Sequence, residues 1–243
     1  MEEKKNVIRE DSVSPGSEIQ SSLIKKPFSR RSFLAFTGIS AAALAFGLQA
    51  CSEDTVTNPA GDAIDLGSGD VGILNYAYAL EQLEAAFYIQ VMSTPYSGMS
   101  GEETSILTDI RDHEIAHRDF FKAAIGSAAI PSLSVNFSTI DFSSRASVLA
   151  TAKAFEDLGV SAYNGAGYYI QNAAYLELAG KIVSVEARHA AAIRDLLSPR
   201  TSAFAGDDIV DPATGLDVQR LPSQVLPIAG AYISTRITAN NLP

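Results

Sequence analysis

The chain has 243 residues, of which 47% are hydrophobic, and its formal net charge is −10 at pH 7. This length supports one sizeable hydrophobic core without requiring a second domain. The acidic balance argues against a nucleic-acid-binding protein, because phosphates are bound by basic patches. The single cysteine, Cys51, excludes an intrachain disulfide and a cysteine-based metal cluster.

Residues 1–51 are predicted to be an export signal. Residues 29–35 read Ser-Arg-Arg-Ser-Phe-Leu-Ala and resemble the twin-arginine export signal. The apolar stretch 33–50 follows, and the Leu-Gln-Ala before Cys51 resembles a lipoprotein cleavage box, with glutamine an unusual residue before the alanine. On this interpretation the exported protein begins at Cys51. A lipid on that residue would hold it at the membrane, on the periplasmic or cell-surface side.

The alternative for the apolar stretch is a transmembrane helix, since its length is just sufficient to span a bilayer. The lone cysteine at the end of the stretch favours a cleaved lipoprotein, because it has no other evident role. Residues 52–69 are rich in Ser, Asp, Thr, Gly and Pro and lack an apolar period. They are therefore predicted to be a flexible tether.

Four segments with helical periodicity predict an all-α four-helix bundle over residues 70–198. The predicted helices are Asp70–Met92, Gly101–Ile125, Ser143–Ile170 and Ala173–Leu197. Asp70 is expected to be the N-cap of the first helix. The links within each pair are short, so each pair is expected to form antiparallel neighbours. The long link 126–141 predicts a crossover that joins the two hairpins.

Residues 199–243 break the helical pattern. Prolines and glycines are frequent there, and the apolar stretch Val225–Ala229 lacks a helical period. This segment is predicted to be an irregular, extended C-terminal tail wrapped on the bundle. It would contribute to an interface if the chain forms a homo-oligomer.

One pattern occurs twice with nearly equal spacing: Glu-x6-Tyr followed by Glu-x-x-His. The first copy is Glu81, Tyr88, Glu114 and His117, and the second is Glu156, Tyr163, Glu186 and His189. A lone Glu-x-x-His carries little information, because a surface ion pair at i,i+3 gives the same letters. The matched repeat is far more specific, since the chain has only three histidines.

The repeated pattern predicts a site for two divalent ions. Residues i and i+3 of an α-helix lie about 60° apart around its axis, so each Glu-x-x-His pair can reach one ion together. The predicted ligands are Glu81, Glu114, His117, Glu156, Glu186 and His189. In bundles of this kind the Glu-x-x-His carboxylates are expected to bridge the two ions. Imidazole with carboxylate suits iron or manganese, and zinc also binds such ligands.

Tyr88 and Tyr163 are the candidate catalytic residues. Each lies two helical turns beyond a predicted ligand, about 20° from the ligand face. They are expected to be hydrogen-bond donors to the ligands or redox-active phenols. Glu84 is expected to be solvated, with an additional ligand as the alternative, and His113 is expected to lie at the surface or beside a ligand.

The alternative to a metal site is a structural bundle that has lost its metal. Glu81, Glu114, Glu156 and Glu186 would then be buried carboxylates without cations. Burial of an unpaired charge costs several kcal/mol unless the group is protonated, and this cost favours a metal site.

The repeated pattern and the segment Leu80–Tyr88 (Leu-Glu-Gln-Leu-Glu-Ala-Ala-Phe-Tyr) resemble the ferritin-like superfamily of di-iron carboxylate proteins. The resemblance covers roughly Asp70 to Leu197 and is greatest for secreted ferritin-like domain proteins, a branch that includes plant desiccation-related proteins. It implies a four-helix bundle that binds two iron ions, with manganese as the alternative. In many members it implies reaction with dioxygen or peroxide. Gly159 stands where the second copy would repeat Glu84, so the copies are not equivalent there.

Two functions remain open at this point. The first is an exported oxidoreductase whose dinuclear centre oxidises ferrous iron or reacts with oxygen or peroxide. The second is a non-catalytic metal-binding or stress-protective lipoprotein. Metal content and turnover of the purified protein distinguish the two.

Overall fold

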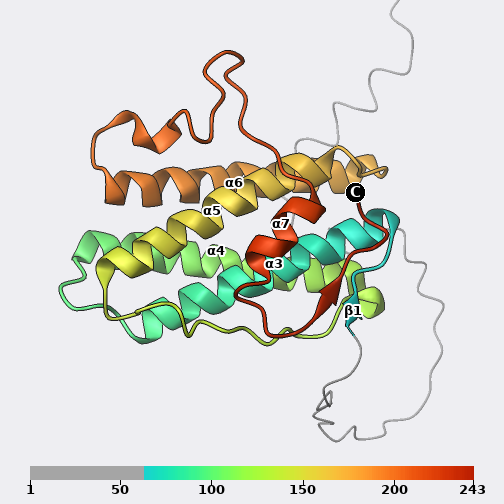
Figure 1. Cartoon of the computed structure of the whole chain (residues 1–243), viewed down its shortest axis with the longest axis horizontal. Coiled ribbons are helices and arrows are strands. Elements are labelled where there is room, and N and C mark those ends of the chain that lie inside the picture. The colour runs from blue at the N-terminus through green and yellow to red at the C-terminus, as the bar shows by residue number, and fades with distance from the viewer. Residues whose placement is uncertain (1–62) are drawn as a thin grey trace, which may run out of the picture. The chain divides into compact units, whose positions relative to one another are not determined.

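A computed structural model describes residues 63–243. The predicted export signal, Cys51 and the tether as far as residue 62 lie outside the described residues. The long helices of the described chain lie side by side, and the C-terminal segment packs across α3 (Gly69–Ser93) and α5 (Arg145–Gly167) (Figure 1). No helix within residues 63–243 is both long enough and apolar enough to cross a membrane.

The four predicted helices are all present, and the all-α fold class is confirmed. They are α3 (Gly69–Ser93), α4 (Gly101–Ile125), α5 (Arg145–Gly167) and α6 (Ala173–Leu197). Helix α3 packs along α4 and α5 packs along α6, as the short links require. The link between the two hairpins is largely extended after one 3-10 turn, η2 (Gly126–Ala128).

The helix ends follow local side-chain chemistry, with one departure from prediction. A capping box begins α4, since Ser100 Oγ accepts from Glu103 N at 3.1 Å and Glu103 Oε2 accepts from Ser100 N at 2.8 Å. The prediction that Asp70 caps α3 is wrong, because Ser68 holds the N-cap position. The Asp70 carboxylate instead accepts from the backbone N–H groups of Gln171 and Asn172, at 2.8 and 2.9 Å. It therefore ties the start of α6 to the start of α3.

Helix α3 is the central helix of the bundle, with 17 of its 25 residues buried. A helix buried on all sides needs partners for its polar residues, and the crossover supplies them. Asn75 accepts from Ile130 N at 3.0 Å, and its amide donates to the carbonyl of Ala128 at 3.0 Å. Gln82 likewise accepts from Leu133 N at 2.8 Å. These bonds hold the crossover over α3 and keep water away from it.

The C-terminal segment is more ordered than the sequence indicated. It contains a 3-10 turn η3 (Ser202–Ala205), helix α7 (Pro222–Ala229) and strand β2 (Ile237–Thr238). The expectation that Val225–Ala229 is not helical is therefore wrong. Proline at the first helical position starts α7, and Val225 and Ala229 are fully buried. Packing on α3 and α5 thus gives this short helix a stability that its own periodicity does not predict.

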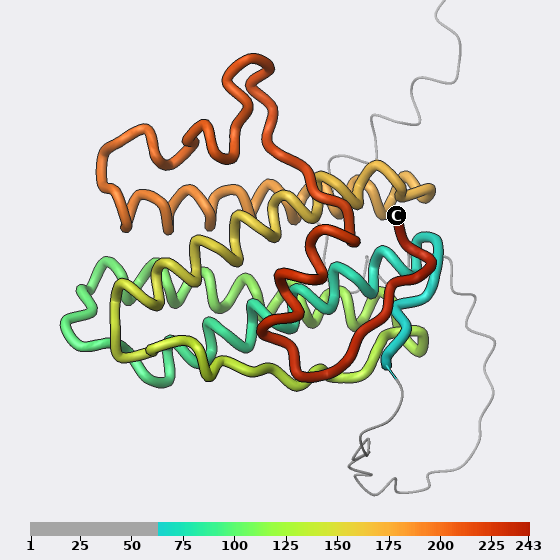
Figure 2. Tube along the Cα trace, in the orientation of Figure 1, coloured from blue at the N-terminus to red at the C-terminus, as the bar shows by residue number. Residues whose placement is uncertain are grey.

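The prediction of a flexible tether over residues 52–69 is wrong for its last residues, from Ile64 onward. Strand β1 (Ile64–Asp65) pairs in parallel with β2, and Ile64 N donates to the Arg236 carbonyl at 2.8 Å. Leu66 is fully buried in the core. The two ends of the described chain therefore lie together beside the bundle, as the path of the tube shows (Figure 2).

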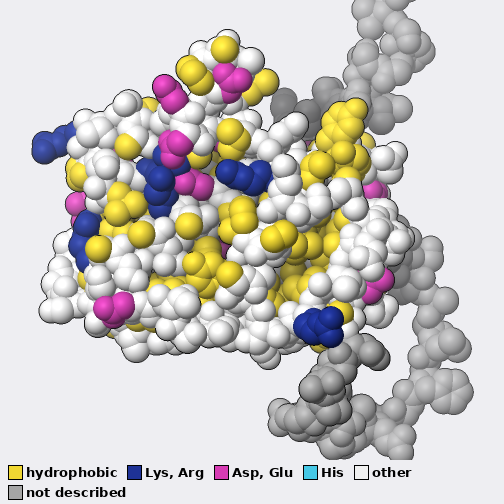
Figure 3. Space-filling view, viewed as in Figure 1, with side chains coloured by type: hydrophobic (Ala, Val, Ile, Leu, Met, Phe, Trp, Pro, Cys, Tyr) yellow, Lys and Arg dark blue, Asp and Glu magenta, His cyan; other side chains and the backbone are white. Residues whose placement is uncertain are grey.

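A buried arginine attaches the earlier part of the C-terminal segment. Arg194 of α6 is 3% exposed, and its Nη2 lies 2.7 Å from Asp157 Oδ2 and 2.8 Å from Asp208 Oδ2. A guanidinium shared by two carboxylates gives a fixed, directional contact. On the face that carries α7, apolar side chains are interspersed among scattered charges, and no histidine is visible (Figure 3).

The C-terminal segment lies directly against the backbone of α5 at Gly165. A Cβ added there would lie 1.9 Å from the carbonyl oxygen of Arg220. The backbone N–H of Arg220 also donates to the Ser161 carbonyl at 2.9 Å. Only a residue without a side chain allows this contact.

We predict that Gly165→Ala lowers the free energy of unfolding by about 1–3 kcal/mol, because the backbone at Arg220 must move. Gly180→Ala is the matched control, since Gly180 lies within α6 and nothing is within 4 Å of an added Cβ. The control is expected to raise the free energy of unfolding by up to about 1 kcal/mol. Denaturant unfolding of the two variants measures the difference. Equal stabilities would contradict the close packing.

Candidate metal centre

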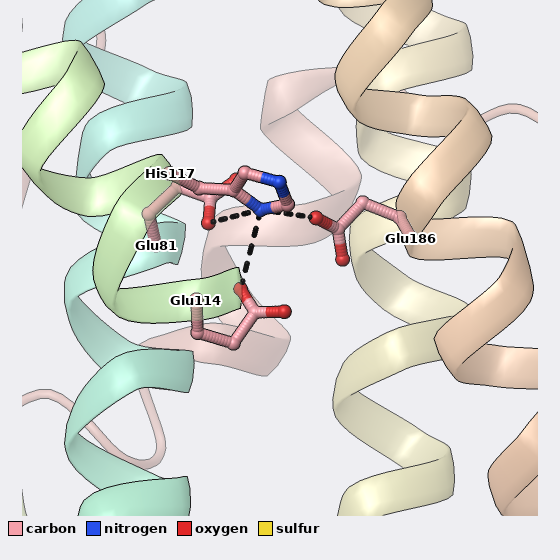
Figure 4. Close-up of side chains that lie close together, drawn as sticks. All are labelled: Glu81, Glu114, His117 and Glu186. Atoms are coloured by element: carbon pink, nitrogen blue, oxygen red, sulfur yellow. Dashed lines mark ion pairs between the residues drawn. The ribbon is translucent and has the colours of Figure 1, made fainter. Parts of the chain in front are cut away.

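The six predicted ligands converge in the interior of the bundle from all four helices. They form two groups whose ligand atoms lie within 4.8 Å of one another: Glu81, Glu114, His117 and Glu186 in one, and Glu114, Glu156, Glu186 and His189 in the other. Figure 4 shows the first group, in which the side chains of α3, α4 and α6 point toward a common centre. Glu114 and Glu186 belong to both groups.

The first group is arranged around the imidazole of His117. Its Nδ1 lies 2.8 Å from Glu186 Oε1 and 3.5 Å from Glu81 Oε2. The distance from the same nitrogen to Glu114 Oε2 is 3.8 Å. One nitrogen and three oxygens thus surround one position.

The second group repeats this arrangement around His189. Its Nδ1 lies 2.9 Å from Glu114 Oε1 and 3.5 Å from Glu156 Oε2. The distance to Glu186 Oε2 is 3.6 Å. Glu114 and Glu186 therefore each present one oxygen to either group, which is the arrangement that a carboxylate bridging two ions requires.

The ligand set is almost completely withdrawn from water. All four glutamates are 0% exposed and His189 is 4% exposed, whereas the His117 side chain is 13% exposed. The repeated spacing explains this burial locally, because each Glu-x-x-His pair lies on one face of its helix. Helices α3 and α5 each add one glutamate from the opposite side of the core.

Eight buried polar atoms in the six side chains make no well-oriented hydrogen bond within the described residues, and their shortest contacts are ion pairs with one another at 2.8 and 2.9 Å. The eight atoms are Glu81 Oε2, Glu114 Oε1 and Oε2, His117 Nδ1, Glu156 Oε2, Glu186 Oε1 and Oε2, and His189 Nδ1. An unsatisfied buried polar atom costs about 1–3 kcal/mol, and more when it is charged. These atoms divide into two sets, each with one histidine nitrogen and three carboxylate oxygens. This donor set therefore fits two cations, and carboxylate with imidazole is the chemistry that iron, manganese and zinc accept.

The two tyrosines account for the remaining carboxylate oxygens. Tyr88 of α3 donates its hydroxyl to Glu156 Oε1, and Tyr163 of α5 donates to Glu81 Oε1. Each tyrosine thus serves the glutamate of the other helix. These bonds fix both carboxylates and leave each with one free oxygen directed at the centre. The structure places both phenols where hydrogen-bond donors to the ligands were expected.

Without bound metal, the close packing of these carboxylates and imidazoles shifts their pKa values strongly. Burial raises the pKa of Glu114 well above its usual value, and the nearby carboxylate of Glu186 adds to this. Burial also raises the pKa of Glu156, to about 7. Burial by itself would lower the pKa of His189, but contacts with the carboxylates, that of Glu114 first, raise it to about 12.

The histidines therefore act as the counter-charges in the metal-free protein. Burial would raise the pKa of Glu186, but hydrogen bonds with the two histidines outweigh this and lower it to about 2. Metal ions bind deprotonated ligands, so two divalent ions would displace the protons on the histidines and the protonated glutamates.

Two residues near the centre differ from expectation. Glu84 is 4% exposed, so its expected solvation is wrong, and it belongs to neither ligand group. A Cβ at Gly159 would lie 3.0 Å from Glu84 Oε1, so the glycine makes room for this carboxylate. Burial, and then the charge of Glu114, raise the pKa of Glu84 well above its usual value. The sequence signal for this buried carboxylate was the difference between the two copies, which have Glu84 and Gly159 at corresponding positions.

His113 is exposed and lies beside the proposed ligand His189. This agrees with the expectation of a position at the surface or beside a ligand. His113 Nδ1 is 2.9 Å from His189 Nε2, and the two rings are nearly parallel, with a centroid distance of 5.1 Å. It belongs to neither ligand group among the described residues.

Comparison with known proteins agrees with the fold. The sequence model of the ferritin-like domain matches residues 69–199. The chain belongs to this ferritin-like family. The match spans the four helices α3 to α6 and therefore both copies of the repeated pattern. A search of curated proteins found no match to this ferritin-like chain.

We predict that Glu114→Gln abolishes tight binding of both ions, because this carboxylate faces both positions. Its metal-free form is expected to be more stable than the metal-free wild type, because an amide needs no counter-charge. Glu177→Gln is the control, since Glu177 is exposed on α6 and pairs with Lys181. Elemental analysis and denaturant unfolding provide the two measurements. Two tightly bound ions in Glu114→Gln would refute the assignment of Glu114.

Proposed function

We propose that this ferritin-like protein binds two iron or manganese ions and uses them in redox chemistry with dioxygen or peroxide. The observation that carries the proposal is the set of eight buried donor atoms that make no well-oriented hydrogen bond, one histidine nitrogen and three carboxylate oxygens in each group. In the proposed assignment Glu81 and His117 hold one ion, Glu156 and His189 hold the other, and Glu114 and Glu186 hold both. A structural bundle without metal would leave these atoms unsatisfied.

The protein's own groups have distinct roles in this proposal. Bound iron or manganese would supply one-electron redox steps and polarise a coordinated oxygen species. Tyr88 and Tyr163 hold the outer oxygens of Glu156 and Glu81, which limits each glutamate to one free oxygen. Each ion would be held by one histidine and three glutamates of this chain. The dry interior would strengthen every electrostatic contact at the site.

Substrate access is proposed on the side of α4 and α6. His117 is the most exposed of the six proposed ligands, with 13% of its side chain accessible to solvent. On the side away from α4 and α6, helix α3 is covered by the crossover and by α7. A small species such as ferrous iron, dioxygen or peroxide would therefore approach past the histidines.

We predict two ions per chain and oxygen- or peroxide-dependent turnover after loading with ferrous iron or with manganese. Tyr88→Phe frees the outer oxygen of Glu156 and is expected to lower turnover or metal affinity about 10- to 100-fold. Tyr168→Phe is the control, because Tyr168 is 85% exposed. Metal analysis, oxygen consumption and peroxide loss are the measurements. Two ions without turnover would overturn the redox proposal and support a non-catalytic, stress-protective metal-binding protein.

We also propose that the protein is exported and lipid-anchored at Cys51. The twin-arginine-like segment 29–35 and the cysteine at the end of the apolar stretch support this location. A lipid-anchored bundle would present its metal site outside the cytoplasm.

Cys51→Ser is expected to move the protein from the membrane fraction to the soluble fraction, as measured by fractionation and immunoblotting. Replacing Arg30 and Arg31 together by lysine is expected to block export. An unchanged membrane fraction for Cys51→Ser would support a spanning helix, and normal export of the lysine variant would exclude the twin-arginine route.

A further inference from the structure

The two proposed ion positions differ in what lies behind each histidine. His189 directs Nδ1 at the carboxylates, and its other nitrogen, Nε2, lies 2.9 Å from His113 Nδ1. The two rings are nearly parallel, with an interplanar angle of 10°. His189 is therefore held by a hydrogen bond to His113 as well as by its own helix.

This contact permits only one arrangement of protons when His189 binds an ion. The ion requires the lone pair of Nδ1, so the ring proton must be on Nε2. That N–H then donates to Nδ1 of His113, which accepts while its own proton is on the opposite nitrogen. A ligating imidazole whose second nitrogen is fixed in this way is better oriented and more basic.

His117 has no equivalent support. Among residues 63–243, no hydrogen bond to His117 Nε2 is found, and the His117 side chain is more exposed than that of His189 (13% against 5%). The residue before the glutamate is His113 in the first copy of the repeated pattern and Val185 in the second. Valine cannot accept a hydrogen bond, so the sequence itself lacks the partner.

We infer that the two ion positions are inequivalent and that His113 is the positioning residue that makes the Glu156–His189 position the tighter one. The Glu81–His117 position releases and exchanges its ion more readily. This inference rests on the proposed binding of two ions by the ferritin-like centre. It adds an order of loading, in which one ion is resident and the other is exchangeable.

The test is calorimetric titration of the metal-free full chain with Mn²⁺, supported by competition with a chelator. The wild type is expected to bind two ions in two steps whose dissociation constants differ at least about tenfold. His113→Phe keeps an aromatic ring at this position but removes the acceptor, so it is expected to weaken the tight step about 10- to 100-fold and leave the weak step unchanged.

His113→Asn is the rescue variant, because its side-chain oxygen can take the place of Nδ1, and it is expected to restore the tight step. Asp112→Asn controls for a change at the neighbouring exposed position. Circular dichroism verifies that each variant is folded, which is expected because His113 is exposed.

The outcomes separate this inference from the proposed function. Two ions of equal affinity in the wild type, or an unchanged tight step in His113→Phe, would overturn the role of His113 while the metal centre stands. Equal weakening in the Phe and Asn variants would also overturn it, because the hydrogen bond would then not be responsible. Absence of Mn²⁺ and Fe²⁺ binding by the wild type would overturn the proposed function itself.

Discussion

The fold is built around four glutamate carboxylates that are completely buried in one place. Each of the four long helices contributes one of them, and all have 0% exposure. Mutual repulsion and lost hydration would expel these groups from an ordinary core, because an unpaired buried charge costs several kcal/mol. Two tyrosines satisfy one oxygen each of Glu81 and Glu156, and the two histidines form ion pairs with the carboxylates. The two histidine nitrogens and six carboxylate oxygens at the centre still lack a hydrogen bond, and this donor set fits two cations.

Keeping this centre dry depends on segments outside the four helices. Asn75 and Gln82 use their amides to hold the crossover against α3. The C-terminal segment passes over α5 so closely that only glycine is tolerated at position 165. Arg194 of α6 attaches an earlier part of the same segment through Asp208. The bundle therefore has one covered side and one side where the histidines approach solvent.

The two hairpins are nearly equivalent, and the exceptions lie beside the centre. Tyr88 of α3 and Tyr163 of α5 each donate to the glutamate of the other helix, and Glu114 and Glu186 each present one oxygen to either histidine. Glu84 has no counterpart because Gly159 takes its place and provides the space that it fills. His113 has no counterpart because Val185 precedes the second Glu-x-x-His. A symmetric set of proposed ligands thus has unequal surroundings, and these would give two bound ions different affinities.

Much of the helical architecture followed from the sequence. The bounds of α4 and α6 agree with prediction because capping residues, turn residues and apolar periodicity are local signals. The prediction Ser143–Ile170 made α5 too long at both ends. The helix begins after the cap at Ser144, and it ends at Gly167, where glycines weaken it. The identity of the proposed ligands was also local information, because i,i+3 spacing on a helix determines which side chains share a face.

Only the tertiary structure decided the rest, because those features depend on contacts between residues far apart in the chain. Helix α7 forms where periodicity is absent, since burial against α3 and α5 stabilises it. Strand β1 joins the end of a segment predicted to be a tether with residues near the C-terminus. The burial of Glu84 and the contact of His113 with His189 likewise arise from the packing of different helices. The sequence by itself determined which side chains could bind metal, and the packing of the two hairpins decided that they face one another in a dry interior.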